Sequence, residues 1–265
     1  MIIIGEKINA TRKAIAAALE ARDAAHIRKI AVQQAQAGAT HIDVNGGDPR
    51  PGREAENMAW LMEVVQGATD LPVAVDTADP QAAKVGLAAA KAKPILNSVS
   101  LEAHRLEKML PIAAERDCMV IALLMSDGGT PCGVDDRLRS AEALLGKLAG
   151  AGKKLDEIIV DPCFLPVSAE ASSGRMVIDA IARIRANWPD VHIGGGLSNI
   201  SFGLPQRKVV NLAAVAQCIY AGMDAAIVDP CVPGMVGMML AAEAVAGRDE
   251  FCMNYVMAGR EGKLV

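Results

Sequence analysis

The feature that most constrains the fold is a regular alternation of short apolar runs with longer segments of helical pattern. Eight apolar runs of strand length recur at a spacing of about 30 residues, which is the length of one β-α-β unit. They are Ile2–Ile4, His41–Asn45, Leu71–Val75, Pro94–Val99, Met119–Met125, Glu157–Val160, His192–Ile193 and Ala225–Val228. A helical segment follows each run. This order requires parallel strands joined by right-handed crossovers.

Eight such units in a chain of 265 residues match the size of a (β/α)8 TIM barrel. We therefore predict an α/β fold in which residues 1–265 form a single barrel domain. A doubly wound open sheet is the alternative, because its buried parallel strands are equally apolar.

Composition excludes several classes of function. The net charge is −4 with both signs interspersed, so the sequence predicts no surface for nucleic acid and no polybasic membrane anchor. No run approaches the roughly 18 apolar residues of a membrane span. The first residues, Met1–Lys7, do not have the pattern of a signal peptide. The six cysteines show no CxxC spacing and are typical of reduced thiols, which indicates a cytoplasmic protein.

Polar residues gather where the predicted strands end. They are Asn9, Asp43, Asn45, Asp76, Asn97, Asp127, Asp161, Ser198, Asn199 and Asp229. In a barrel these side chains share the carboxyl-terminal face, where active sites form. We expect no lysine on a strand, which disfavours Schiff-base chemistry. No strand-end histidine is present to build a nucleophilic triad, and the four histidines (26, 41, 104 and 192) are interpreted as structural.

The stretch Gly194–Asn199 combines three successive glycines with two neutral polar side chains. Glycine lets a backbone lie close against a ligand, and Ser198 and Asn199 supply donors and acceptors without charge. The structural alternative is a tight turn capped by the asparagine.

Two kinds of site would use the strand-end residues. Carboxylates from several strands could hold Mg²⁺ or Mn²⁺, since no histidine stands near them. Alternatively, carboxylates and amides match a neutral heterocycle rich in N–H groups, such as a 2-amino-4-oxo pterin. A carboxylate accepts paired hydrogen bonds from the ring N–H and the exocyclic amine, and Asn and Ser satisfy the other positions.

Five motifs in order give a specific resemblance along nearly the whole chain. They are Gly38–Gly47 (GATHIDVNGG), Pro72–Thr77 (PVAVDT), Asn97-Ser98, Asp161-Pro162 and Gly196–Asn199 (GLSN). Together they resemble the pterin-binding barrel superfamily and, within it, most closely the methyltetrahydrofolate:corrinoid protein methyltransferases.

This resemblance implies a site and a reaction. Asp76, Asn97 and Asp161 would bind the pterin ring, with Gly196 and Ser198 lining the same pocket. Asn199 would be catalytic, since it would hydrogen-bond the N5 atom that carries the methyl group. The enzyme would move that methyl group, in either direction, between (methyl)tetrahydrofolate and the cobalt of cobalamin on a transient corrinoid-protein partner. No resident metal is expected.

The chemistry of the amide suits this role. Methyl transfer from N5 leaves a basic nitrogen, and protonating it or donating a hydrogen bond to it stabilises the departing amine. An Asn amide can donate to N5 or accept from N5–H⁺. The alternatives are a dihydropteroate synthase-like condensing enzyme and a folate-binding protein without catalysis. The cationic motifs of the synthases are not evident in Gly194–Asn199, and Arg207-Lys208 follows that stretch.

Smaller features leave choices open. Cys163, Cys231 and Cys132 could suggest zinc, although small-residue packing is the simpler interpretation. Arg50 and Arg53 could meet the glutamate tail of a folate or could be solvated loop charges. A methionine stripe (Met235, Met238 and Met239) is typical of a core, with a dimer contact as the alternative. We expect a homodimer, with the corrinoid protein docking over three loops, Gly46–Arg53, Ser126–Gly133 and Phe164–Ser173.

Overall fold

The computed structural model describes residues 1–264, and within them the predicted (β/α)8 barrel is confirmed. Eight parallel strands follow one another in the order β7-β6-β5-β4-β3-β2-β1-β8. Their bounds are β1 (Ile2–Asn9), β2 (His41–Asn45), β3 (Val73–Asp76), β4 (Ile95–Leu101), β5 (Met119–Ser126), β6 (Ile158–Asp161), β7 (His192–Ile193) and β8 (Ala225–Val228). The pairing of the first strand with the last excludes a doubly wound open sheet.

The glycine stretch after β7 closes the barrel. Ile227 N donates to Gly195 O at 2.9 Å, and Asp224 N donates to Ile193 O at 3.0 Å, which joins β7 and the residues after it to β8. A Cβ atom on Gly194 would lie 1.9 Å from Ala225 O. Glycine is required there because the two backbones approach too closely for any side chain.

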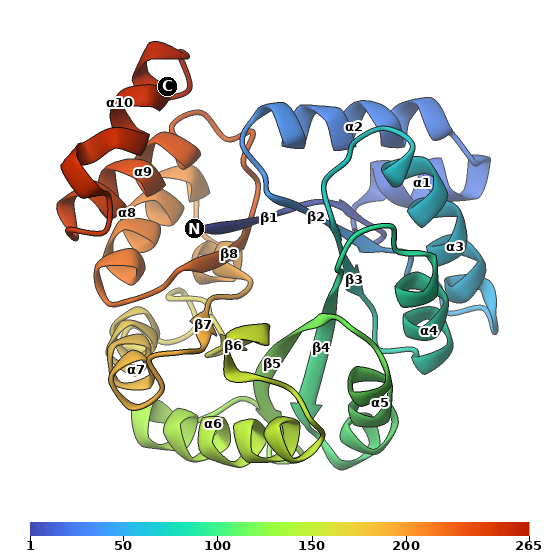
Figure 1. The fold of residues 1–265 in the computed structure, drawn as a ribbon, viewed down its shortest axis with the longest axis horizontal. Coiled ribbons are helices and arrows are strands. Elements are labelled where there is room, and N and C mark those ends of the chain that lie inside the picture. The colour runs from blue at the N-terminus through green and yellow to red at the C-terminus, as the bar shows by residue number, and fades with distance from the viewer. Residues whose placement is uncertain (265) are drawn as a thin grey trace.

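Helices form an outer layer around the strands, as Figure 1 shows. They are α1 (Lys13–Ala21), α2 (Ala24–Gln36), α3 (Arg53–Gln66), α4 (Pro80–Ala89), α5 (Ala103–Glu115), α6 (Gly133–Gly150), α7 (Ser173–Asn187), α8 (Arg207–Tyr220), α9 (Met235–Val245) and α10 (Met253–Arg260). Three short 3₁₀ helices are η1 (Leu155–Glu157), η2 (Leu197–Ser201) and η3 (Glu250–Cys252). Within residues 1–264, no helix is both long enough and apolar enough to cross a membrane.

The inside of the barrel has two layers, and their order positions the site. The lower layer is an apolar cluster of Ile4, Ala74, Ile95, Ile121, Ile159 and Ala225. Two residues further along each of these strands stand Glu6, Asp76, Asn97, Leu123, Asp161 and Ile227, all of which line one cavity. Because successive side chains alternate between faces, residues two apart share the inner face. The apolar layer therefore forms a plug beneath a polar pocket.

Strand β1 differs from the expectation. It runs to Asn9, well beyond the apolar run Ile2–Ile4, and it contains Lys7, so the prediction that no lysine stands on a strand is wrong. The register against β2 shifts between Gly5 and Ile8, which is a bulge that accommodates one extra residue. The bulge interrupts the apolar pattern, and the apolar run in the sequence is therefore shorter than the strand. The Lys7 ammonium lies 3.3 Å from Asp229.

Candidate active site

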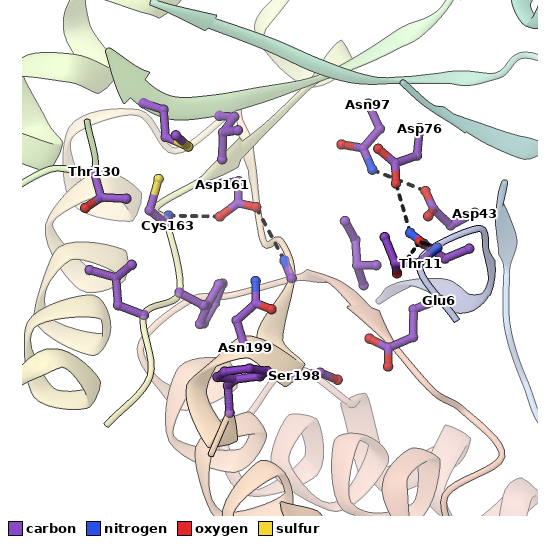
Figure 2. Close-up of a pocket in the computed structure, with 18 of the residues that line it drawn as sticks. Glu6, Thr11, Asp43, Asp76, Asn97, Thr130, Asp161, Cys163, Ser198 and Asn199 are labelled. Atoms are coloured by element: carbon purple, nitrogen blue, oxygen red, sulfur yellow. Dashed lines mark hydrogen bonds between the residues drawn. The ribbon is translucent and has the colours of Figure 1, made fainter. Parts of the chain in front are cut away.

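A cavity of about 580 Å³ opens at the carboxyl-terminal ends of the strands. Its wall contains every residue that the sequence nominated for pterin binding: Asp76, Asn97, Asp161, Gly196, Ser198 and Asn199. Figure 2 shows two polar groups in this cavity, one around Asp161 and the other around Asp43 and Asp76. Each group is organised differently.

The first group contains two carboxyls, Asp43 and Asp76, each of which accepts hydrogen bonds from side-chain amides. Asn9 and Asn45 donate from their side chains to Asp76 Oδ2 at 3.3 and 3.1 Å, and Asn97 donates to Asp43 Oδ1 at 3.2 Å. Burial and the charge of Asp76 raise the pKa of Asp43 well above its usual range. Burial also raises the pKa of Asp76, although the Asn45 hydrogen bond opposes this. Two buried carboxyls side by side favour a shared proton, and we assign it to Asp43.

The second group centres on Asp161, at the end of β6. Its carboxylate accepts hydrogen bonds from Cys163 N at 2.9 Å and Gly196 N at 3.3 Å. Burial raises the pKa of Asp161 to about 6, against the lowering effect of these N–H groups and of Arg137. The group therefore titrates close to neutrality.

The glycines after β7 leave room for Asp161 and for the barrel seam. A Cβ on Gly195 would lie 2.1 Å from the Asp161 carboxyl group, and one on Gly196 would lie 3.0 Å from Asn199 Nδ2. Gly196 lines the cavity, whereas Gly194 faces β8. The expectation that all three glycines approach a ligand was therefore too broad.

Ser198 and Asn199 lie on η2, immediately after these glycines. Asn199 N donates to Gly196 O at 3.1 Å, so the backbone does make the expected tight turn. The Asn199 side chain is exposed and lines the cavity, and in Figure 2 it lies below the Asp161 group. Its amide is accessible to a ligand.

Charged residues missing from the sequence prediction also line the cavity. Glu6 on β1 is paired with Arg12 at 2.9 Å, and burial raises its pKa against the effects of Ser198 and Arg12. Arg207, the first residue of α8, donates to Ser198 O at 2.6 Å and its guanidinium carbon is 6.0 Å from the centre of the Phe202 ring. Arg12 lies in the loop after β1, and Arg207 is the first residue of α8. A search limited to strand ends therefore could not find either arginine.

Other strand-end residues serve the walls and loops instead. Asn45 supports Asp76, Asp127 accepts from Ala103 N at 3.1 Å at the start of α5, and Asp229 pairs with Lys7. Outside the cavity wall, Arg50 pairs with Glu20 and Asp48, and Arg53 pairs with Glu56. These pairings favour the interpretation of Arg50 and Arg53 as ordinary loop charges.

No group of three or more His, Cys, Asp or Glu in residues 1–264 is arranged to hold a metal ion. Cys163 is buried, Cys231 is half-buried and Cys132 is exposed. His41 and His192 lie at the starts of their strands, far from the cavity end, and burial lowers the pKa of His41 to about 4. His192 contacts Asp224 at 3.0 Å, as a structural residue does.

Comparisons with known proteins agree with this geometry. The family model for pterin binding enzymes matches residues 5–229. The chain is 36% identical over its whole length to the methylcorrinoid:tetrahydrofolate methyltransferase of Eubacterium limosum, of which it covers 98%. It is 28% identical to methionine synthase of Mycobacterium tuberculosis over 86% of this chain and 20% of that protein.

Solved structures show the same fold at low identity. Dihydropteroate synthase from Xanthomonas albilineans in complex with 7,8-dihydropteroate superposes with a TM-score of 0.72 at 20% identity over 92% of both chains. The Coxiella burnetii dihydropteroate synthase in complex with pteroic acid gives 0.73 at 14% identity, covering 92% of this chain and 93% of that one. With the family match and the full-length relative, the conclusion is that this chain belongs to the pterin-binding enzymes and, within them, to the family of methylcorrinoid:tetrahydrofolate methyltransferases.

Proposed function

We propose that the protein transfers a methyl group between N5 of tetrahydrofolate and the cobalt of a corrinoid carried by a partner protein. The observation that carries this proposal is one cavity in which Asp76, Asn97 and Asp161 line the wall and the side-chain amide of Asn199 is exposed to a ligand. The full-length likeness to a methylcorrinoid:tetrahydrofolate methyltransferase supports the same reaction.

The donor set fits a pterin. Asp161, ionised above pH of about 6, accepts a pair of N–H groups from the pyrimidine half of the ring. Asp76 and Asn97 offer one carboxylate and one amide to the remaining ring positions, with Gly196 and Ser198 against the same ligand. The mixture of acceptors and amides suits a neutral heterocycle better than a cation, so we expect chelators to leave activity unchanged.

Asn199 acts at N5. Its amide donates to the nitrogen as the carbon–nitrogen bond breaks and accepts from N5–H⁺ in the protonated substrate. The corrinoid supplies a cobalt centre that accepts or donates the methyl group. This chain holds the pterin so that N5 faces the open end of the barrel.

Glu6 is our proposed source of the N5 proton. It lies in the cavity wall, it interacts with the Ser198 hydroxyl beside Asn199, and burial raises its pKa. A carboxyl of raised pKa holds its proton to higher pH than an ordinary glutamic acid and can donate it to the nitrogen as the carbon–nitrogen bond breaks.

The p-aminobenzoylglutamate tail leaves the pterin from C6, the atom next to N5. It therefore emerges beside Asn199 and passes Phe202, the residue after η2, and Arg207, the first residue of α8. Phe202 is 64% exposed and offers a ring face, and Arg207 offers a cation for a tail carboxylate. We assign the tail to these residues in place of Arg50 and Arg53.

We propose that the corrinoid protein docks over the mouth of the cavity and contacts the loops Gly46–Arg53, Ser126–Gly133 and Phe164–Ser173, of which the last two contribute Thr130 and Phe164 to the cavity wall. Few large apolar side chains lie in these loops, which favours a transient encounter.

For the homodimer, Met235 and Met239 are buried and therefore belong to the core. The exposed apolar side chains Phe251, Met253, Val256 and Met257 near the carboxyl terminus are our proposed dimer contact.

A cytoplasmic location is consistent with six free cysteines.

To test the function, the protein is titrated with 5-methyltetrahydrofolate and then mixed with cob(I)alamin or a methylated corrinoid protein. Binding followed by methyl transfer in both directions supports the proposal. Binding without transfer leaves a folate-binding protein, and release of pyrophosphate from a pterin pyrophosphate supports a synthase.

A further inference from the structure

Arg137 on α6 is fully buried, although arginine is rarely buried without a paired carboxylate. Its guanidinium donates only to backbone carbonyls: from Nε to Pro162 O at 2.6 Å, from Nη1 to Gly133 O at 2.9 Å and from Nη2 to Cys163 O at 3.1 Å. Within residues 1–264, no carboxylate forms an ion pair with it. A buried, unpaired cation is costly, and such groups often have a function in the site they adjoin.

Two of the three carbonyls that accept from Arg137 belong to Pro162 and Cys163, the two residues after Asp161. Cys163 has a φ of 61°, a left-handed conformation that is unusual for a residue other than glycine. In this turn the Cys163 N–H points to the Asp161 carboxylate while the Cys163 carbonyl accepts from Arg137. Arg137 therefore stabilises the backbone conformation that aims one of the two N–H donors at Asp161.

Arg137 also links this turn to the mouth of the cavity. Gly133 begins α6 and ends the loop that carries Thr130, a residue of the cavity wall. One guanidinium group thus joins the loop after β5 to the turn after β6.

The charge of Arg137 acts on Asp161 as well. Burial raises the pKa of Asp161, and the Cys163 and Gly196 N–H groups oppose this, with the charge of Arg137 adding a smaller effect in the same direction as the N–H groups. Asp136 and Glu170, together with the thiols of Cys132 and Cys163, are the titratable groups that act on Arg137. Asp136 is paired with Arg139 at 3.2 Å, so its charge is already partly balanced.

We propose that Arg137 is a positioning residue for the pterin-binding carboxylate: it fixes the turn Asp161–Cys163 that aims the Cys163 N–H at Asp161, and its buried positive charge adds to the effect of that N–H group. This inference rests on the proposed role of Asp161 in pterin binding. Arg137 itself touches no substrate, because it lies behind the turn.

The test compares Arg137→Met and Arg137→Lys with a matched control, Arg185→Met. Arg185 also donates to carbonyls, those of Gly222, Pro189 and Val191, but at the opposite end of the barrel and with Asp224 as an ion-pair partner. Affinity for 5-methyltetrahydrofolate is measured from pH 5 to 9, together with thermal unfolding. The Asp161 carboxyl is titrated directly by ¹³C NMR without ligand, with Asp161→Asn to assign its signal.

Arg137→Met should weaken folate binding and should move the acid limb, the pH range over which affinity falls as Asp161 gains its proton, to higher pH. Arg137→Lys retains the charge without the planar fork and should leave the limb near its wild-type position while weakening binding. Arg185→Met should lower thermal stability without moving the limb. In Asp161→Asn, which lacks the charge, the Arg137→Met substitution should not change the pH profile.

An unchanged acid limb and an unchanged Asp161 titration in Arg137→Met would overturn the proposal and leave Arg137 a purely structural residue. If Arg137→Met does not fold, the Arg137→Lys variant decides. An acid limb that moves to higher pH in Arg137→Lys, which retains the positive charge, would contradict the role of the charge. If the wild-type protein binds no folate, the proposed function fails, while the ligand-free titration of Asp161 still tests Arg137.

Discussion

The Asp161 carboxylate occupies the space that a side chain on Gly195 would need: a Cβ there would lie 2.1 Å from the carboxyl carbon. Two strand ends that are 34 positions apart in the chain therefore constrain each other. The Asp161 carboxylate can take its position only because the segment after β7 has no side chain at Gly195.

Gly195→Ala should therefore displace Asp161 and lower the affinity for tetrahydrofolate by about tenfold, near 1.4 kcal/mol. The matched control is Gly146→Ala on α6, where a Cβ would meet nothing within 4 Å. That control should leave folate affinity unchanged and raise the free energy of unfolding by about 0.5–1 kcal/mol. Isothermal titration and denaturant unfolding measure the two effects. Wild-type affinity in Gly195→Ala would mean that Asp161 is not held at a fixed position.

Asp161→Ala should chiefly weaken folate binding, by about 1.5–3 kcal/mol, because a hydrogen bond to a charged group is lost in both ground and transition states. Folate affinity of the wild-type enzyme should fall as the pH drops through about 6, where the carboxylate gains its proton. A pH-independent affinity between 5 and 8 would remove Asp161 from the binding site.

The same pKa has a consequence for stability. Because burial raises the pKa of Asp161 from 3.8 to about 6, its contribution to folding is fully present below pH 3.8 and is lost as the pH rises through 6. Ligand-free wild-type protein should therefore lose free energy of unfolding relative to Asp161→Asn across that interval, on the order of 1–3 kcal/mol. Urea unfolding at pH 4, 5, 6 and 7 measures the difference. A difference that stays constant with pH would contradict the raised pKa.

Asn199→Ala should lower the single-turnover rate of methyl transfer by about 10²–10³-fold, the usual cost of losing one preorganised donor at a developing charge. The measurement uses folate-saturated enzyme, so that binding does not contribute. A wild-type rate would reduce Asn199 to a turn residue.

Arg207→Ala should weaken binding of tetrahydrofolate by about threefold to tenfold, in keeping with an exposed contact to a carboxylate of about 1 kcal/mol. Binding of 6-methyltetrahydropterin, which lacks the tail, should not change. Arg53→Ala is the control, since Arg53 pairs with Glu56 outside the cavity wall. Equal losses for both ligands would show that Arg207 acts on the pterin pocket instead of the tail.

Much of this site could be predicted from sequence because strand periodicity encodes it. Ile95 and Asn97, or Ile159 and Asp161, are two positions apart, so an apolar plug with a polar layer above it follows once the strands are recognised. The helices α1 and α10 are additional to the single helical segment expected after each strand.

The groups that depend on tertiary approach could not be predicted. Arg207 reaches the cavity from a helix start, and Glu6 lies on the part of β1 that follows the apolar run Ile2–Ile4, where the bulge interrupts the apolar pattern. The need for glycine at Gly195 depends on a side chain from another strand. Nor does any local pattern reveal that Arg137 holds the turn after Asp161, because those carbonyls come from residues 25 and 26 positions away.

The central claim is that this cavity activates a methyl group on N5 for transfer to cobalt. The most direct measurement mixes the enzyme with 5-[¹³C]methyltetrahydrofolate and cob(I)alamin and follows the labelled methyl group by NMR. The account predicts that the label leaves nitrogen and appears on cobalt in the presence of wild-type enzyme, and far more slowly with Asn199→Ala. A label that remains on N5, with the folate demonstrably bound and both free cobalamin and corrinoid proteins supplied, would contradict it.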